Sequence, residues 1–418
     1  MSPIRIAAVA SALHFALLLL QPAHAHDVSE WRLCKHGNAE AAIAACSTLI
    51  DAGRLDGENM SVIYNNRGIA HFSRKEYDRA IEDATKSIAI DPEFAWAYNN
   101  RGLAHMAKGE RERAIADYSE AIRIDPRLAW AYNNRGLARA SAGQHGGAIS
   151  DYASAIEIDG TFAWAFNNRG LAHAQLNQYE RAFADYSKAI EQDAGFAWAY
   201  NNRGLAYTRQ RKYDAAVADF TKAVELDPKL AWAYNNRGLA RVSLHQHQGA
   251  IEDYTRAIGV DPQFAWPYNN RGLVYASIGQ HARAIADYTM AISLEASNPW
   301  PFNSRAWAYL QTGKAMQGLR DAERALELVP NNATFRNTRE HILEVIGQKK
   351  GAAADISRDR SPKGRNANLA SRKGRDAKLG SQKRGPAKAA SASDSKKKKN
   401  AKNSAQAGTK PVRRASRD

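Results

Sequence analysis

Cysteine is scarce in this sequence, and its scarcity excludes several kinds of site. The chain has 418 residues and 2 Cys, which excludes a cysteine-rich zinc site, a CxxC redox motif and a disulfide framework. No glycine-rich phosphate loop occurs, and Ser/His/Asp sets can be assembled only by ignoring the repeat described below. A metal held by His245 and His247 is a remote alternative. We therefore predict no catalytic residue, no metal, no cofactor and no enzyme activity.

Long hydrophobic runs are missing after residue 25. Residues 1–25 carry one positive charge, Arg5, then an apolar run from Ile6 to Leu20, and they end in Ala23-His24-Ala25. This is the order of a signal peptide with a small-x-small cleavage site. The run is shorter than the ~20 residues that cross a bilayer, so an uncleaved membrane anchor is the weaker alternative. We expect cleavage after Ala25 and export, to a periplasm by preference or out of the cell.

Acidic residues are few in the last part of the chain. The formal net charge is +16, and residues 348–418 hold 22 Lys or Arg, 5 Asp or Glu and no aromatic residue. Such a segment cannot bury a core and is expected to be disordered. We predict that it binds a polyanion, namely anionic lipid, acidic polysaccharide or nucleic acid; a merely solubilising tail is the alternative. The densest positive charges are Lys396, Lys397, Lys398, Lys399, Arg413 and Arg414.

The dominant feature that is present is a repeat of 34 residues. The string Asn-Asn-Arg-Gly begins at residues 65, 99, 133, 167, 201, 235 and 269, and a degenerate copy begins at Asn303. A fixed period of this length is typical of stacked helical units rather than of a globular domain. We predict eight units over residues 61–332: 61–94, 95–128, 129–162, 163–196, 197–230, 231–264, 265–298 and 299–332.

Each unit is expected to be a pair of helices, and its positions are numbered 1 to 34 below. In the second unit the helices are expected over Ala95–Lys108 and about Arg111–Ile124, with Gly109 between them. Small residues at positions 8 and 20 let the two helices approach, and an aromatic residue at position 24 fills the space beside them. The pattern resembles the tetratricopeptide repeat (TPR) family, whose unit has Gly at 8, Ala at 20 and an aromatic residue at 24.

The resemblance covers about two thirds of the chain. It implies an all-α, right-handed superhelical solenoid of helix pairs that serves as an interaction scaffold. Residues 26–60 are expected to form a capping helical hairpin, joined to the first unit by a loop over Asp51–Asn59. Residues 333–347 are expected to form a helix that covers the last hydrophobic face. Cys34 and Cys46 fall on the two helices of the first cap, and export favours a disulfide between them.

Position 7 is Arg and position 23 is Asp in all eight units, from Arg67 and Asp83 to Arg305 and Asp321. In the TPR family position 7 is usually apolar. The arginines could anchor a ligand, or each could pair with the Asp of its own unit across the two helices. The strict coincidence of Arg and Asp favours the second interpretation. Three histidines at position 11 are expected in the core: His71, His105 and His173.

Positions 2, 5, 6, 9 and 13 share the other face of the first helix. In the TPR family this face lines the concave groove. Position 2 is Trp in seven units, position 5 is Asn in all eight and position 6 is Asn in seven. The predicted ligand groove consists of Trp96, Asn99, Asn100, Trp130, Asn133, Asn134, Trp164, Asn167, Asn168, Trp198, Asn201, Asn202, Trp232, Asn235, Asn236, Trp266, Asn269 and Asn270.

The asparagines allow two interpretations. A carboxamide both donates and accepts, so evenly spaced Asn beside Trp could hold the main chain of an extended peptide. Alternatively, the asparagines bond a neighbouring helix and the tryptophans pack as core. Asn has poor helix propensity, so its repetition needs a reason, and ligand binding is favoured.

The sequence thus predicts a non-enzymatic scaffold outside the cytoplasm that receives an extended peptide segment of a partner protein. Two alternatives remain open. One is a polysaccharide-handling envelope protein, because Trp faces stack on sugar rings and Asn bonds hydroxyl groups. The other is binding of nucleic acid or another polyanion through the basic tail.

Overall fold

The structure is a computed structural model that describes residues 25–359, with side chains described from Ser29 to Gln348. This part of the chain is all α-helical, with 19 helices and no strand. None of its helices is long and apolar enough to cross a membrane. The predicted signal peptide, apart from Ala25, and the basic residues Lys396–Lys399, Arg413 and Arg414 lie outside the described residues.

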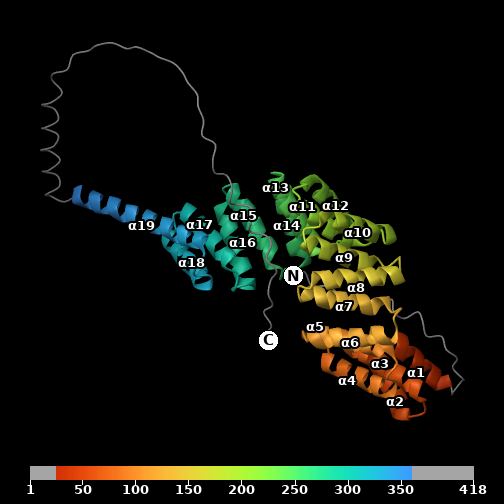
Figure 1. The fold of residues 1–418 in the computed structure, drawn as a ribbon. Coiled ribbons are helices and arrows are strands. Elements are labelled where there is room, and N and C mark those ends of the chain that lie inside the picture. Colours follow the sequence, from red (N-terminus) through yellow and green to blue (C-terminus); the bar gives the residue numbers. More distant parts are fainter. Residues whose placement is uncertain (1–24, 360–418) are drawn as a thin grey trace, which may run out of the picture. The chain divides into compact units, whose positions relative to one another are not determined.

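The helices follow one another in antiparallel pairs (Figure 1). Their bounds are α1 Ala25–His36, α2 Ala39–Ala52, α3 Gly57–Ser73, α4 Tyr77–Ile90, α5 Ala95–Lys108, α6 Arg111–Ile124, α7 Ala129–Ser141, α8 His145–Ile158, α9 Ala163–Gln175, α10 Tyr179–Gln192, α11 Ala197–Arg209, α12 Tyr213–Leu226, α13 Ala231–Ser243, α14 His247–Val260, α15 Ala265–Ser277, α16 His281–Leu294, α17 Pro299–Gln311, α18 Ala315–Leu328 and α19 Ala333–Asp359.

The described chain divides into two bodies, residues 25–267 and residues 268–359, with the boundary inside α15. Each body is a TPR-like stack of helix pairs, and each is described by itself. The helix bounds predicted for the second unit are those of α5 and α6. Two predicted boundaries differ from the structure. The loop before the first unit is shorter than Asp51–Asn59, because α2 runs to Ala52 and α3 begins at Gly57; the last helix, α19, continues past Gly347 to Asp359.

A left-handed turn separates the two helices of every unit. The residue at position 15 has a positive φ throughout: it is Gly109, Gly143, Gly279 or Gly313 in four units and Lys75, Asn177, Arg211 or His245 in the others. In the second unit Gly109, at φ 85°, ends α5, and its N–H bonds the carbonyl of Met106. A residue other than Gly is strained at this φ, so the close packing of the two helices must hold the turn in the four units without Gly.

Close contact between the glycine at position 8 and the ring at position 24 brings the two helices together. A Cβ added at Gly102 would lie 2.7 Å from the Tyr118 ring, and one added at Gly136 would lie 2.6 Å from the Tyr152 ring. Both rings are fully buried. The first and eighth units have Ala84 and Ala322 at position 24 instead. In the first unit the backbones approach more closely, and a Cβ on Gly68 would lie 3.2 Å from the carbonyl oxygen of Ala80.

Candidate functional site: the face of the first helices

The asparagines at positions 5 and 6 form a continuous chain of side-chain hydrogen bonds in the body 25–267. The Nδ2 of position 6 donates to the Oδ1 of position 5 in the preceding unit, at 2.8–3.0 Å, in Asn100–Asn65, Asn134–Asn99, Asn168–Asn133, Asn202–Asn167 and Asn236–Asn201. Within a unit, the Nδ2 of position 5 donates to the Oδ1 of position 6, at 3.2–3.4 Å, in Asn99–Asn100, Asn133–Asn134, Asn167–Asn168 and Asn201–Asn202. Each carboxamide in this row donates to the next one toward the N-terminal end of the array, as in Asn134 to Asn99, Asn99 to Asn100 and Asn100 to Asn65.

These hydrogen bonds give the asparagines a role inside the fold. Asn99, Asn133, Asn167 and Asn201 are each only 2% exposed, and a buried carboxamide without partners is costly. The repetition of a poor helix former is therefore explained by contacts between units, which is the structural interpretation left open by the sequence. Each carboxamide still has a second N–H and a second lone pair. A ligand role for the asparagines thus stays a prediction, limited to these remaining groups.

The tryptophans at position 2 are half-buried, apart from Trp300, which is 39% exposed. Their rings pack against the residue at position 34 of the same unit, with centroids 4.5 Å apart for Trp130–Phe162 and for Trp164–Phe196. Leu128 and Leu230 take the same place against Trp96 and Trp198 in their apolar clusters. One part of each ring thus belongs to the core, as the alternative interpretation proposed, while the remainder of the ring is open to solvent.

Leucines at position 9 add an apolar surface beside the predicted groove residues. Position 9 shares its helix face with positions 2, 5 and 6. Leu205 is 36% exposed and Leu239 is 41% exposed; one exposed Leu is ordinary, but here two lie at the same position of successive units. The sequence signal was available, because position 9 is Ile or Leu in seven units. The sequence places position 9 on the groove face, but it does not show which of these side chains stay open to solvent.

A cleft of about 340 Å³ lies at the N-terminal end of this face. Trp96, Asn99 and Asn100 of α5 and Trp130 and Asn134 of α7 line it, so five of the predicted groove residues border one cavity. The cap also lines it, mainly through α1 and in part through Ala39 and Ala42 of α2. The lining is therefore aromatic and amide-rich, like that of most ligand clefts.

Comparisons with protein-family models identify the repeats. Tetratricopeptide repeat models match residues 61–94, 197–230 and 267–298, and a TPR repeat model matches residues 104–143, 136–177, 173–211 and 240–279. Together these matches cover more than half of the chain. The chain belongs to the tetratricopeptide repeat family. TPR proteins typically bind protein or peptide partners, and their fold is generally a scaffold rather than a catalytic one. No curated protein matches the chain.

Several solved structures are similar to this one. The crystal structure of the APC/C hetero-tetramer Cut9–Hcn1 is 15% identical, with a TM-score of 0.51 over 76% of this chain; the match spans 62% of that chain's length. A TPR protein from Parabacteroides merdae is 19% identical over 60% of this chain and 98% of its own, with a TM-score of 0.46. YrrB, described as a TPR protein with an unusual peptide-binding site, is 22% identical over 45% of this chain and 97% of its own, with a TM-score of 0.39. At these identities the likeness shows the fold alone.

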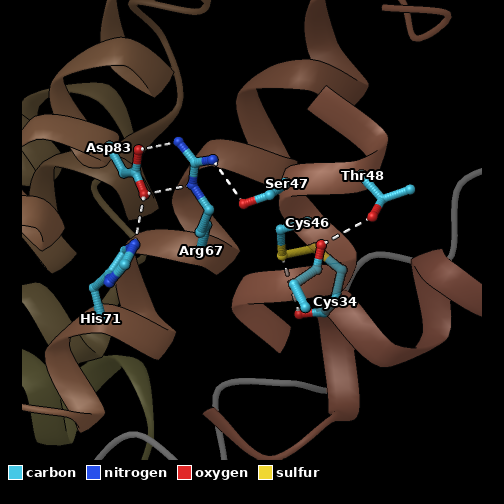
Figure 2. Close-up of a disulfide and its surroundings, with 8 residues drawn as sticks. Cys34, Cys46, Ser47, Thr48, Arg67, His71 and Asp83 are labelled. Atoms are coloured by element: carbon cyan, nitrogen blue, oxygen red, sulfur yellow. Dashed lines mark hydrogen bonds and ion pairs between the residues drawn. A yellow bond between two sulfur atoms is a disulfide. The ribbon is translucent and has the colours of Figure 1, made fainter. Parts of the chain in front are cut away.

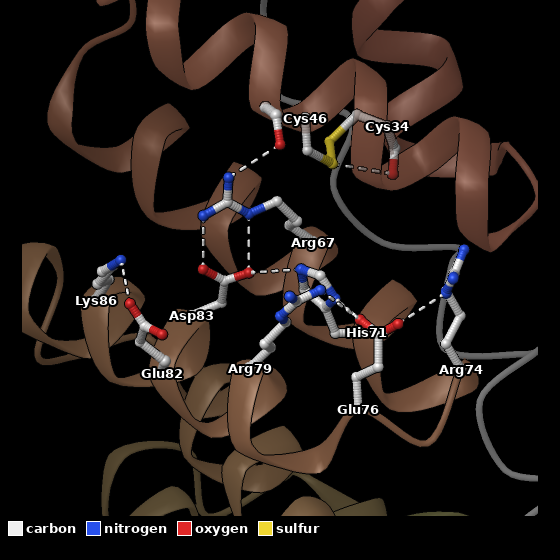
Figure 3. A network of polar contacts seen from close by, with 11 residues as sticks. Cys34, Cys46, Arg67, His71, Arg74, Glu76, Arg79, Glu82, Asp83 and Lys86 are labelled. Carbon is white, nitrogen blue, oxygen red and sulfur yellow. Dashed lines mark hydrogen bonds and ion pairs between the residues drawn. A yellow bond between two sulfur atoms is a disulfide. The ribbon is translucent and has the colours of Figure 1, made fainter.

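The Arg and Asp of each TPR unit form a two-point ion pair across the helices. In the first unit the Nε and Nη2 of Arg67 donate to the two carboxylate oxygens of Asp83 at 2.9 and 2.8 Å (Figure 3). Hydrogen bonding to Asp83 raises the pKa of Arg67. The same pair is present in the other units: Arg101–Asp117, Arg135–Asp151, Arg169–Asp185, Arg203–Asp219, Arg237–Asp253, Arg271–Asp287 and Arg305–Asp321. The structural interpretation of position 7 is confirmed.

Where position 25 of the preceding TPR unit is Ser or Thr, the same arginine also connects the two units. The Nη1 of Arg101 reaches the hydroxyl group of Thr85 at 3.3 Å, and that of Arg135 reaches Ser119 at 3.2 Å. These hydroxyl residues occupy position 25 of the preceding unit. In the first unit Arg67 bonds Ser47 on α2 at 3.0 Å, so the N-terminal cap is joined to the array as if it were another unit.

Histidines at position 11 complete these polar networks. The Nδ1 of His71 lies 2.7 Å from Glu76 and its Nε2 lies 3.8 Å from Asp83 (Figure 3). The bond from His71 lowers the pKa of Glu76. In the second unit, bonds from His105 and Lys108 lower the pKa of Glu110 to about 2. These buried histidines are core residues, as expected, and their contacts are structural.

The cap is closed by its two cysteines. Cys34 on α1 and Cys46 on α2 lie on facing helices with their sulfur atoms bonded, at an S–S distance of 2.07 Å (Figure 2). Both side chains are buried in a cluster with Ala45, Leu49 and Ile63, against which Trp31 packs. The geometry therefore permits the predicted disulfide, and its formation in the exported protein stays a prediction.

The two histidines that were a remote metal candidate do not form a cluster. The rings of His245 and His247 have centroids 6.3 Å apart, and His245 is the left-handed turn residue of its unit. Within residues 25–359 no group of three or more His, Cys, Asp or Glu side chains is placed to hold a metal ion.

Proposed function

We propose that this protein is a non-enzymatic scaffold that binds an extended peptide segment of a partner along the face made by positions 2, 5, 6 and 9. The exposed leucines at position 9 support this proposal. Leu205 and Leu239, together with the open parts of Trp198 and Trp232, make an apolar surface over two successive units, and contiguous exposed apolar surfaces are typically interaction sites. Among the carboxamides of this face, Asn66 and Asn100 are half-buried rather than buried, and each has hydrogen-bonding groups left for a main chain.

A peptide-display selection and a glycan array, both probed with residues 26–418, test this function. A peptide segment should be selected, and Leu239→Glu should weaken its binding, because a carboxylate would be desolvated against an apolar ligand. Val260→Glu is the matched control. Val260 is exposed to a similar degree in the same unit but lies at the end of the second helix. If the glycan array alone gives ligands, the polysaccharide alternative is correct.

The compartment is part of the same proposal. The signal-like residues 1–25 and a Cys pair able to form a disulfide both suit an exported protein. Edman sequencing of the protein recovered from the envelope fraction of its own cells should begin at His26. A sequence that begins at Met1 or Ser2 would show that the segment is not removed.

Composition favours a second binding activity for the basic tail. Its 22 Lys or Arg against 5 Asp or Glu predict attraction to anionic surfaces, at about 1 kcal/mol per charge near an anionic membrane. A chain that ends at Asp359 should melt like the full mature chain but lose retention on anionic vesicles or acidic polysaccharide. Retention of the full chain should fall with rising salt. Equal retention of the shortened chain would assign the polyanion site to the TPR array instead.

A further inference from the structure

The 340 Å³ cleft is built by the cap as well as by the repeats. Trp31 and Lys35 of α1 form one side, while Trp96 and Trp130 lie on the first helices of the second and third units. Cys34 also borders it. The cap helix α1 is therefore one wall of a ligand-sized cavity, a role beyond the covering of a hydrophobic end.

The chain of asparagine hydrogen bonds ends in this cleft. Asn65 accepts a bond from Asn100 at 2.8 Å, but within the described residues its own Nδ2 donates to no group, unlike the Nδ2 of Asn99 in the next unit. Asn65 and Asn66 both line the cleft. Aligned hydrogen bonds polarise one another, which strengthens each by roughly 10–30%, so the N–H at the end of the chain is a good donor without an acceptor.

The charges of the cleft restrict its occupant. Lys35 and His36 are the ionisable groups among its lining residues, and no Asp or Glu borders it. A cationic segment is therefore disfavoured, which argues against the basic tail of this chain as the occupant. Three indole rings and Phe94 favour a large apolar or aromatic side chain, and the unpaired donor of Asn65 favours a carbonyl oxygen beside it.

The disulfide holds the α1 wall in place. Helix α1 has 12 residues, a length that is marginal for a helix by itself. Cys34–Cys46 joins it covalently to α2, and α2 is joined to the first unit by the bond between Ser47 and Arg67 (Figure 2). Without the covalent link, the position of Trp31 and Lys35 would depend on the small apolar cluster around Ile63.

We propose that this cleft is an anchor site that takes one aromatic side chain of an extended, non-cationic peptide, whose main-chain carbonyl accepts a hydrogen bond from Asn65, and that the Cys34–Cys46 disulfide preorganises the site. The proposal rests on the peptide-binding function above and deepens it. It assigns the partner segment an aromatic residue, places that residue at the N-terminal end of the face, and makes binding sensitive to reduction.

The probe is acetyl-Ala-Ala-(4-fluorophenylalanine)-Ala-Ala-amide, titrated with residues 26–418 and followed by its ¹⁹F resonance. The probe should bind, and Trp96→Ala should weaken it about tenfold or more, as for an aromatic anchor. Tyr213→Ala, a half-buried aromatic residue on the second helix α12 outside the cleft, is the control and should leave the affinity within about twofold. A probe with Lys at both ends should bind more weakly than the neutral one.

Reduction tests the role of the disulfide. The reduced protein and the double variant Cys34→Ser/Cys46→Ser should each bind the probe about threefold or more weakly, because a mobile wall must be ordered on binding. Far-UV circular dichroism should show that the helices of the array remain. Unchanged affinity after reduction would refute preorganisation by the disulfide.

Other outcomes separate this proposal from the general function. If Leu239→Glu weakens the probe as much as Trp96→Ala does, the probe binds elsewhere on the face; the anchor site is then wrong and the peptide-binding function stands. If the probe does not bind while display-selected peptides still do, the anchor site is likewise wrong and the peptide-binding function stands. If maltotriose binds in the cleft and the peptide does not, both proposals are wrong and the site is a saccharide site.

Discussion

Replacement of Asn168 by Ala should destabilise the TPR array strongly. Asn168 donates to the Oδ1 of Asn133 at 2.9 Å and accepts from the Nδ2 of Asn167 at 3.3 Å, and all three side chains are buried. The substitution leaves two buried polar groups without partners, at about 1–3 kcal/mol each. Because Ala has a higher helix propensity than Asn, the substitution also stabilises the helix by about 0.6 kcal/mol. We expect a net loss of about 2–5 kcal/mol in the free energy of unfolding.

The assay is urea unfolding followed by far-UV circular dichroism, with hydrogen exchange to find where protection is lost, since repeat arrays can unfold in parts. Protection should fall first in α7 and α9, which carry the broken bonds. Asn66→Ala is the matched control: Asn66 holds the same repeat position in the first unit, is half-buried and makes no side-chain hydrogen bond within the described chain. Its effect should stay within about 0.5 kcal/mol.

The reasoning is refuted if Asn168→Ala unfolds at the same urea concentration as the wild type. If that variant also loses a display-selected peptide, the carboxamides serve the ligand rather than the fold. Loss of both stability and binding would leave the structural role intact, because a disordered face cannot bind.

Three further predictions concern other parts of the body 25–267. Gly136→Ala should lower stability by about 1–3 kcal/mol, since its Cβ would lie 2.6 Å from the Tyr152 ring, whereas Gly259→Ala meets nothing within 4 Å and should add up to about 1 kcal/mol; urea midpoints decide. The pKa of Glu110 lies below its ordinary value of 4.5, at about 2, so its ionised form stabilises the fold above pH 4.5 and this contribution is lost as the pH falls toward 2. Glu110→Gln should therefore flatten the acid limb of a stability–pH curve, and an unchanged limb would contradict the assignment. Alkylation of the unreduced exported protein should label neither cysteine; two reactive thiols would disprove the disulfide.

Much of the fold could be predicted because the sequence repeats its constraints eight times. In six of these units Gly at position 8 leaves room for the ring at position 24, and their coincidence identifies the facing helices. The bounds of α5 and α6 follow from Gly109 and the Asp125-Pro126 step. The end of α19 could not be predicted in this way. The expected helix covers residues 333–347, whereas α19 runs to Asp359, because a helix can continue through one Gly at a cost of about 1 kcal/mol.

The site was harder to predict than the fold. Helical periodicity places Asn133 and Asn134 on the correct face, but it cannot say whether a carboxamide points toward solvent or toward the next unit. That choice depends on the distance between neighbouring first helices, which only the packed array defines. The exposure of Leu205 is equally invisible in one unit, because position 9 is covered or open according to where the adjacent helix lies. The cleft beside Trp31 needed the placement of α1, on which the repeat carries no information.

The asparagine chain also bears on how such an array can change in length. In the body 25–267 each link joins position 6 of one unit to position 5 of the unit before it. The Arg at position 7 reaches back in the same way to position 25 of that unit where a hydroxyl residue stands there, as in Arg135–Ser119 and Arg237–Thr221, whereas Arg169 has Ala153 at that place. Recombination between the repeated stretches of the gene can add or remove 34 codons. The residues that form the contacts between units would then be present at the new junction as well. An insertion of any other length would leave a carboxamide and a guanidinium facing the wrong residues. The array can thus gain or lose whole units at little cost in stability. An insertion or deletion of fewer than 34 residues would break the contacts between units and destabilise the array.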